Sequence, residues 1–122
     1  MKHEFQSTEE TYKILNDLPS YVESVRIVGC AKRYDNEDHF VLRLRVLPTL
    51  KYFLKENDDD SEKFTVFSGK SFDSRNNIRF YYPVGFAEKL SDEFIKLKIH
   101  DLGLICYLQL KPFEKTLISP AA

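Results

Sequence analysis

The sequence has few of the residues on which several classes of protein depend. It contains two cysteines, four glycines, one methionine and no tryptophan among 122 residues. Cys30 and Cys106 are too few for the disulfide framework of a small secreted domain. Both lie in apolar, strand-like stretches, so we expect them to be reduced and structural. The glycines are scattered and form no phosphate-binding loop, which argues against a nucleotide-cradling motif.

Long hydrophobic runs and processing signals are also missing. No apolar stretch approaches the roughly 20 residues that a membrane-spanning helix needs. The first residues contain no apolar segment typical of a signal peptide, and there is no Asn-x-Ser/Thr sequon. These features favour a cytoplasmic protein with no membrane partner.

The overall charge is small but unevenly distributed. The formal net charge is −1, which gives no global electrostatic reason to expect a polyanionic partner. Residues 56–62 hold five of the 19 acidic residues, and without them 18 basic residues face 14 acidic ones, a balance of +4. We expect 56–62 to be an acidic flexible loop. It does not fit a calcium-binding EF-hand, because neither possible frame has Gly at the sixth position and Glu at the twelfth.

The clearest element is the stretch from residue 39 to 47, which alternates between two faces. Phe40, Leu42, Leu44 and Val46 form the expected core face, while two arginines lie on the other face. This period of two is typical of a half-buried strand. Residues 21–33 show a similar pattern, and a short polar connection joins the two stretches. The pair therefore predicts a β-hairpin.

The remaining pattern predicts a β-rich α+β fold in a single domain, 1–122. A capping box at 7–10 and Pro19 predict an N-terminal helix over about 8–17. Further strands are expected at 63–68, 78–82, 93–100 and 104–111, and short helices at 48–56 and 86–90. Apolar spacing over 85–98 fits either helix or strand. About six mostly antiparallel strands should form a curled sheet or small barrel, with 116–122 as a frayed tail.

The outer face of the predicted hairpin carries four basic residues: Arg26, Lys32, Arg43 and Arg45. Small barrels bind single-stranded nucleic acid with a cationic groove and aromatic stacking platforms. These residues are therefore candidates for an OB-like nucleic-acid site. The alternative is a solvated strand face on which arginines keep the surface soluble.

The high aromatic content, 10 Phe and 7 Tyr, suggests a surface for a protein partner. Tyr is favoured at interfaces because its ring is apolar and its tip polar. Tyr81 and Tyr107 are the candidates, and exposed strand edges would add sites for pairing with another chain. The leading hypothesis is thus a non-enzymatic binding module that acts through protein–protein contacts, including self-association. The alternative is that the tyrosines only cover the core.

An enzyme is the third hypothesis. His100, Asp101 and Cys106 hold the residue types of a nucleophilic site. However, the strand pattern places Cys106 on the core face and His100 on the outer face. The histidines and cysteines also lack the close paired spacing of zinc sites. We therefore predict no catalytic residue, no metal ligand and no cofactor.

Overall fold

The computed structural model describes residues 7–19, 25–34, 38–71, 78–111 and 114–118. In this part of the chain the structure is almost entirely β, with one short 3-10 turn, η2 (His100–Leu102). The strands are β1 (Ser7–Leu15), β2 (Ile27–Tyr34), β3 (His39–Leu44), β4 (Leu47–Asn57), β5 (Asp60–Ser71), β6 (Ile78–Lys89), β7 (Phe94–Ile99), β8 (Leu104–Gln109) and β9 (Glu114–Ile118).

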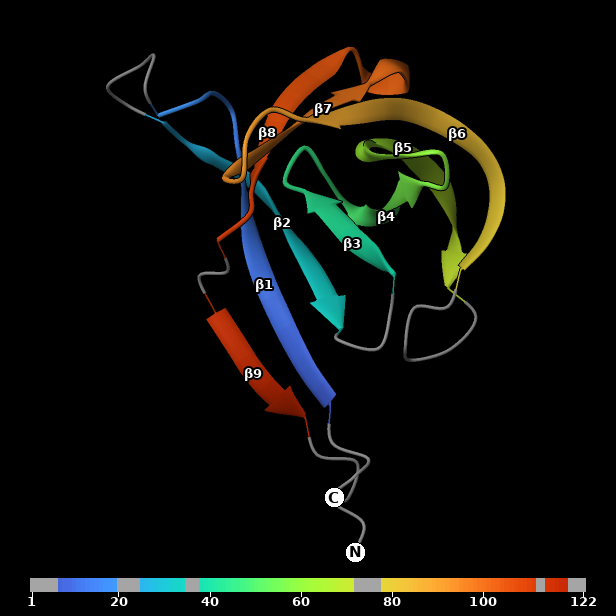
Figure 1. Ribbon diagram of the computed structural model, residues 1–122. Helices are drawn as coiled ribbons and strands as arrows, with labels where there is room; N and C mark the ends of the chain where they lie inside the picture. The colour runs from blue at the N-terminus through green and yellow to red at the C-terminus, as the bar shows by residue number, and fades with distance from the viewer. Residues whose placement is uncertain (1–6, 20–24, 35–37, 72–77, 112–113, 119–122) are drawn as a thin grey trace, which may run out of the picture.

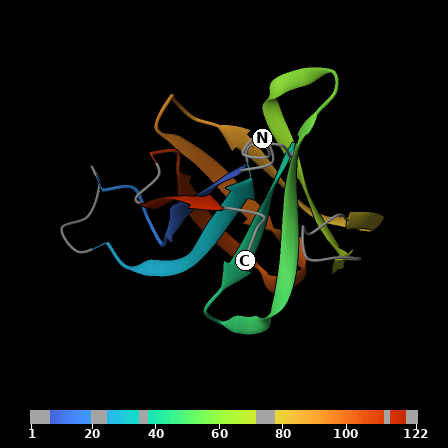
Figure 2. The same ribbon diagram turned by 90° about the horizontal axis from the view of Figure 1, so that it is seen from below.

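Strands β1 to β8 form a closed antiparallel barrel (Figures 1 and 2). Each pairs with the next along the chain, and β1 closes the ring by pairing with both β2 and β8. β9 pairs with the first half of β1, beyond the segment that pairs with β8. Closure leaves the eight strands without a free edge along their paired segments. The expectation of a β-rich, antiparallel small barrel is therefore confirmed, whereas the expected number of about six strands is wrong, because the described residues form nine.

The predicted N-terminal helix over 8–17 is wrong, because most of these residues form β1. Tyr12 and Ile14 point into the barrel and are 5% and 0% exposed. Their spacing of two fits a strand, and β1 has hydrogen-bonded partners on both sides. The strand pairing that closes the barrel therefore determines the conformation here, and the local capping signal does not.

The two short helices were also wrong. Residues 48–56 lie in β4, where Tyr52 and Leu54 face the core. Residues 86–90 lie in β6 except for Leu90, which follows it. The chain passes through Pro83 without ending the strand, because the β5–β6 register shifts beside it. β6 is therefore a long strand with irregularities instead of a strand and a helix.

The predicted hairpin of residues 21–33 and 39–47 is confirmed as the antiparallel pair β2 and β3, with different ends. β2 begins at Ile27, and residues 20–24 lie outside the described part. β3 ends at Leu44, after which Arg45 and Val46 form a turn that leads directly into β4. Val46 is consequently 68% exposed and does not belong to the core, whereas Leu42 is fully buried.

The acidic segment 56–62 is a tight hairpin instead of a loop. Asp58 and Asp59 form its turn, Asn57 pairs with Asp60, and the flanking residues belong to β4 and β5. At the other end of the chain, residues 116–118 of the expected frayed tail belong to β9, and 119–122 lie outside the described residues.

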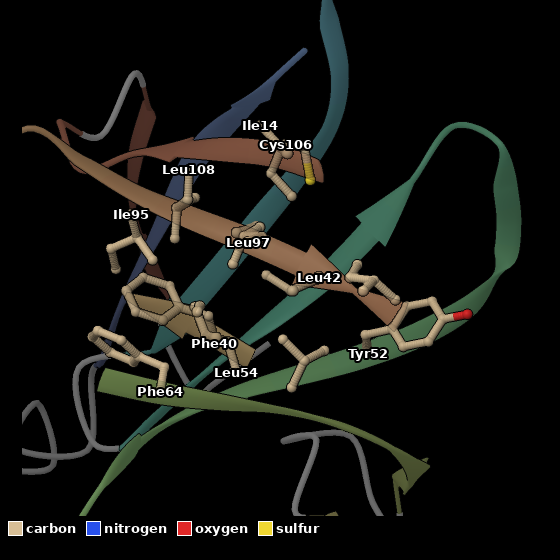
Figure 3. Packing of buried hydrophobic residues seen from close by; sticks show 14 of the residues in the cluster. Ile14, Phe40, Leu42, Tyr52, Leu54, Phe64, Ile95, Leu97, Cys106 and Leu108 are labelled. Atoms are coloured by element: carbon tan, nitrogen blue, oxygen red, sulfur yellow. The ribbon is translucent and has the colours of Figure 1, made fainter. Parts of the chain in front are cut away.

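The interior of the barrel is filled by aliphatic and aromatic side chains from all eight strands (Figure 3). Two glycines allow neighbouring strands to approach closely. A Cβ at Gly29 would lie 2.4 Å from the Arg43 carbonyl oxygen, and one at Gly85 would lie 2.1 Å from that of Lys98. Any larger residue would force these strands apart. Within the described ranges no helix is long and apolar enough to cross a membrane.

Candidate functional site

Two of the four predicted basic residues border a common hollow of about 310 Å³ on the outer side of β1–β3. Arg43 comes from β3, Arg45 from the following turn, and Lys13 joins them from β1. Cys30 pairs with Lys13 on one side and with Arg43 on the other, so the three lie in one row across the strands. We call this feature the arginine hollow; it is lined by Lys13, Ile27, Gly29, Cys30, Arg43, Leu44, Arg45 and Pro48.

Backbone contacts hold the arginine hollow in place. Arg43 Nη1 donates a hydrogen bond to the Pro48 carbonyl oxygen at 3.1 Å. The Arg45 backbone N–H donates to the Val28 carbonyl oxygen at 2.8 Å. The β3–β4 turn is therefore tied to β2, and the Arg43 guanidinium is held beside the turn.

Lys32 and Arg26 do not line this hollow. Lys32 lies two residues beyond Cys30 on the same strand face, and its Nζ is 3.5 Å from a Glu9 carboxylate oxygen. Arg26 precedes β2, and its backbone N–H donates to Asn16 Oδ1. Ile27 and Gly29 pair with consecutive residues of β1, so an extra residue interrupts the alternation there. The pattern that placed Arg26 beside Lys32 therefore does not continue through the start of β2.

A second surface lies on the outer side of β5–β8. We call it the lysine–aromatic face, defined by Lys63, Phe86, Lys96, Lys98, His100, Ile105 and Tyr107. Strand register puts Phe86 opposite Lys98 and Lys98 opposite Ile105. The next row holds Lys63, Glu88, Lys96 and Tyr107. In the first row a lysine therefore lies between two apolar side chains on β6, β7 and β8, and in the second row Glu88 lies between two lysines.

The centre of this face is a hollow of about 330 Å³ whose lining includes the three lysines, Phe86 and His100. Phe86 is 54% exposed, and its ring meets His100 edge-to-face at 5.4 Å between centroids. Ile105 is 50% exposed on the neighbouring side. Exposed aromatic rings such as that of Phe86 are more frequent at binding interfaces than on the rest of a protein surface. Glu88 is the acidic residue of this hollow's lining.

Of the two candidate tyrosines, Tyr107 lies on the lysine–aromatic face and is half-buried. Tyr81 belongs to β6, but its side chain is outside the part that is described. Tyr107 therefore has a basic neighbour, Lys96, that the sequence did not suggest. The interface role of Tyr81 stays a prediction.

The structure keeps Cys106 away from His100 and Asp101. These two lie in the exposed turn η2, which ends at Gly103 in a left-handed conformation with φ 58°. Cys106 is 0% exposed inside the barrel, where burial raises the pKa of its thiol to about 12. Such a thiol stays protonated at neutral pH and is a poor nucleophile. Among the residues described, no three His, Cys, Asp or Glu side chains gather as metal ligands.

Comparison with family models, curated proteins and solved structures finds no match to this chain. Functional inference therefore rests on the two surfaces. Part of the lysine–aromatic face was visible in the sequence, since Lys96, Lys98 and His100 alternate with Ile95, Leu97 and Ile99. Phe86 and Lys13 were missed because helices were expected around them.

Proposed function

We propose that this chain is a non-enzymatic, single-stranded nucleic-acid-binding barrel that uses its lysine–aromatic face. The observation that carries the proposal is the row formed by Phe86, Lys98 and Ile105, in which a lysine lies between two exposed apolar side chains. Proteins that bind single strands combine cationic side chains, which contact phosphates, with rings on which bases stack.

The spacing of the face suits this ligand. Neighbouring strands lie about 4.8 Å apart, and side chains on one face of a strand repeat about every 7 Å. Lys98 is therefore one strand away from Phe86, while Lys63 and Lys96 lie one row further along. A base stacked on the Phe86 ring would leave its phosphate within reach of these flexible ammonium groups. Tyr107 offers a second, less exposed ring next to Lys96.

The local charge matters more here than the net charge of −1. The lining of this hollow contains three lysines and one acidic residue, Glu88. Asn57 also lines the hollow, and the acidic Asp58–Asp59 turn directly follows it in the chain. With about three phosphate contacts, log K should fall with log salt at a slope of roughly −2. Binding should therefore weaken by about 20-fold between 50 and 200 mM salt.

The test is a fluorescence-anisotropy titration with labelled single-stranded DNA and RNA of about 15 nucleotides. Phe86→Ala should weaken binding by roughly 5- to 150-fold, which corresponds to about 1–3 kcal/mol for one stacked base. Lys96→Ala with Lys98→Ala should reduce the salt slope by about 1.4. Val46→Ala serves as the control for Phe86→Ala, because Val46 is an exposed apolar residue in the β3–β4 turn.

The control for the lysine pair removes two charges elsewhere, by Arg26→Ala with Lys32→Ala, because these exposed residues line neither hollow. Absence of binding at low salt would refute the proposal. Equal losses from the two charge-removing pairs would also refute it, because the effect would then be one of net charge alone.

A protein partner is the second candidate, and β9 is the observation that favours it. Among the strands described, β9 pairs with β1 alone, so its other edge is open to another chain. A mass that increases with concentration in light scattering would support self-association through this edge. Binding of polyglutamate in place of oligonucleotides would assign the lysine–aromatic face to an acidic protein.

We place this activity in the cytoplasm. Cys30 and Cys106 are both free thiols, and cytosolic conditions keep such thiols reduced.

A further inference from the structure

The arginine hollow has no role in the function proposed above. The ring order puts β2 opposite β6, so the hollow on β1–β3 and the lysine–aromatic face lie on different sides of the barrel. Its lining combines three cationic side chains with the apolar side chains of Ile27 and Pro48. Within the described residues, neither a carboxylate nor an aromatic ring lines it.

We infer that the arginine hollow binds the dianionic phosphate group of a phosphate ester. Lys13 and Arg43 stand in neighbouring strands on either side of Cys30, so their Cα atoms are about 10 Å apart. The Lys13 side chain is long enough to extend over the thiol, whereas the Arg43 guanidinium is held at the β3–β4 turn by its bond to Pro48. An anion in the hollow would therefore lie between Lys13 on one side and the guanidinium groups of Arg43 and Arg45 on the other.

The arginines favour phosphate over a simple halide ion. A guanidinium presents several N–H donors in a planar fork that matches two phosphate oxygens. The bond from Arg43 Nη1 to the Pro48 carbonyl oxygen uses part of this fork and fixes the plane of the group. The remaining donors of Arg43 and those of Arg45 would then meet the anion without a large loss of side-chain freedom.

The apolar wall indicates that the ligand is an ester and not free phosphate alone. Ile27 is 38% exposed, and Pro48 is also exposed beside the arginines. These side chains offer a surface to the organic part of a ligand. Because the described lining lacks an aromatic ring, base stacking contributes nothing, and the phosphate with its adjoining carbons carries recognition.

Cys30 provides a built-in reporter for this site. Its side chain is half-buried in the lining of the hollow, whereas Cys106 is 0% exposed in the core and serves as the internal control. Alkylation of the folded protein by iodoacetamide, followed by mass spectrometry, should modify Cys30 first. Pyrophosphate and glycerol phosphate should slow this modification in a saturable manner at constant ionic strength.

The matched variants separate this site from the nucleic-acid face. Arg43→Gln with Arg45→Gln should raise the ligand concentration needed for protection by at least about tenfold. Lys96→Ala with Lys98→Ala removes the same number of charges and should leave protection unchanged. Amide chemical shifts of Cys30 and Arg43, followed by NMR during the same titrations, give a readout that does not depend on thiol reactivity.

The ligand series distinguishes the sources of the phosphate. Protection by a 5′-phosphorylated oligonucleotide, but not by its unphosphorylated form, would assign the hollow to a nucleic-acid end. Protection by glycerol phosphate at lower concentration than by inorganic phosphate would assign it to a small ester. No saturable protection or shift change at millimolar phosphate ligands, or the same response in the arginine double variant, would overturn the inference.

Discussion

Gly85→Ala is the sharpest test of the packing between β6 and β7. An added Cβ would lie 2.1 Å from the Lys98 carbonyl oxygen and 2.9 Å from the Ile99 Cα. Both are backbone atoms, which cannot move away by a change of side-chain rotamer. Because Gly85 pairs directly with Ile99, the conflict lies in the barrel wall beside the Phe86–Lys98 pair.

The loss of unfolding free energy follows from the distance by which the added methyl group would push β7 away from β6. Real Cβ atoms are essentially never found closer than 3.0 Å to such neighbours, so the two strands must separate by roughly 1 Å. Overpacking of this kind costs about 1–3 kcal/mol. A shift of this size also weakens one or two adjoining ladder hydrogen bonds, each contributing about 1 kcal/mol. We expect Gly85→Ala to lower the free energy of unfolding by about 2–4 kcal/mol.

Urea denaturation followed by circular dichroism measures this change, with Gly103→Ala as the control. Gly103 has a φ of 58° and nothing within 4 Å of an added Cβ, so its substitution costs only the left-handed backbone strain of about 1–2 kcal/mol. The effect at Gly85 should be the larger of the two. An unchanged denaturation midpoint for Gly85→Ala would show that β6 and β7 do not approach as closely as described.

Two further predictions concern the core and its ionisation. Leu42→Ala should lower the free energy of unfolding by about 2–5 kcal/mol, because Leu42 is 0% exposed. Val46→Ala should change it by less than about 0.5 kcal/mol, because Val46 is exposed. Equal effects of the two substitutions in denaturant titrations would contradict the placement of Val46 in the β3–β4 turn. The free energy of unfolding should fall from pH 9 upward. Burial raises the pKa of the Cys106 thiol from 9.0 to about 12, so the unfolded chain loses this proton first. Denaturation under reducing conditions at pH 8, 9 and 10 should show a shallower decline for Cys106→Ala, and identical slopes would remove Cys106 as the cause.

The inner faces of several strands could be predicted because their pattern is local. In β3, Phe40, Leu42 and Leu44 alternate with outer residues, and all three are buried. Their spacing follows from the pleat of a strand and needs no knowledge of its neighbours. The same logic placed Cys106 correctly inside the barrel. It failed at Val46, where the chain turns after Leu44 and the alternation no longer describes a strand.

The helices were mispredicted because their signals are short and compete with long-range pairing. The capping box at 7–10 and the apolar spacing over 48–56 each describe a few residues. An isolated helix of this length is marginal in water, whereas a strand at the same place gains hydrogen bonds on both sides and buries alternate side chains. β1 illustrates this, since it pairs with β2, β8 and β9.

The binding surfaces were the least predictable part, because they depend on which outer faces become neighbours. Each strand shows its own alternation, but Phe86, Lys98 and Ile105 meet only through the register of β6, β7 and β8. The same applies to Lys13, which joins Arg43 through Cys30. Barrel closure thus turns scattered charges, in a chain with net charge −1, into two separate basic surfaces. A cationic surface can therefore form on a nearly neutral chain, so net charge alone does not exclude an anionic ligand.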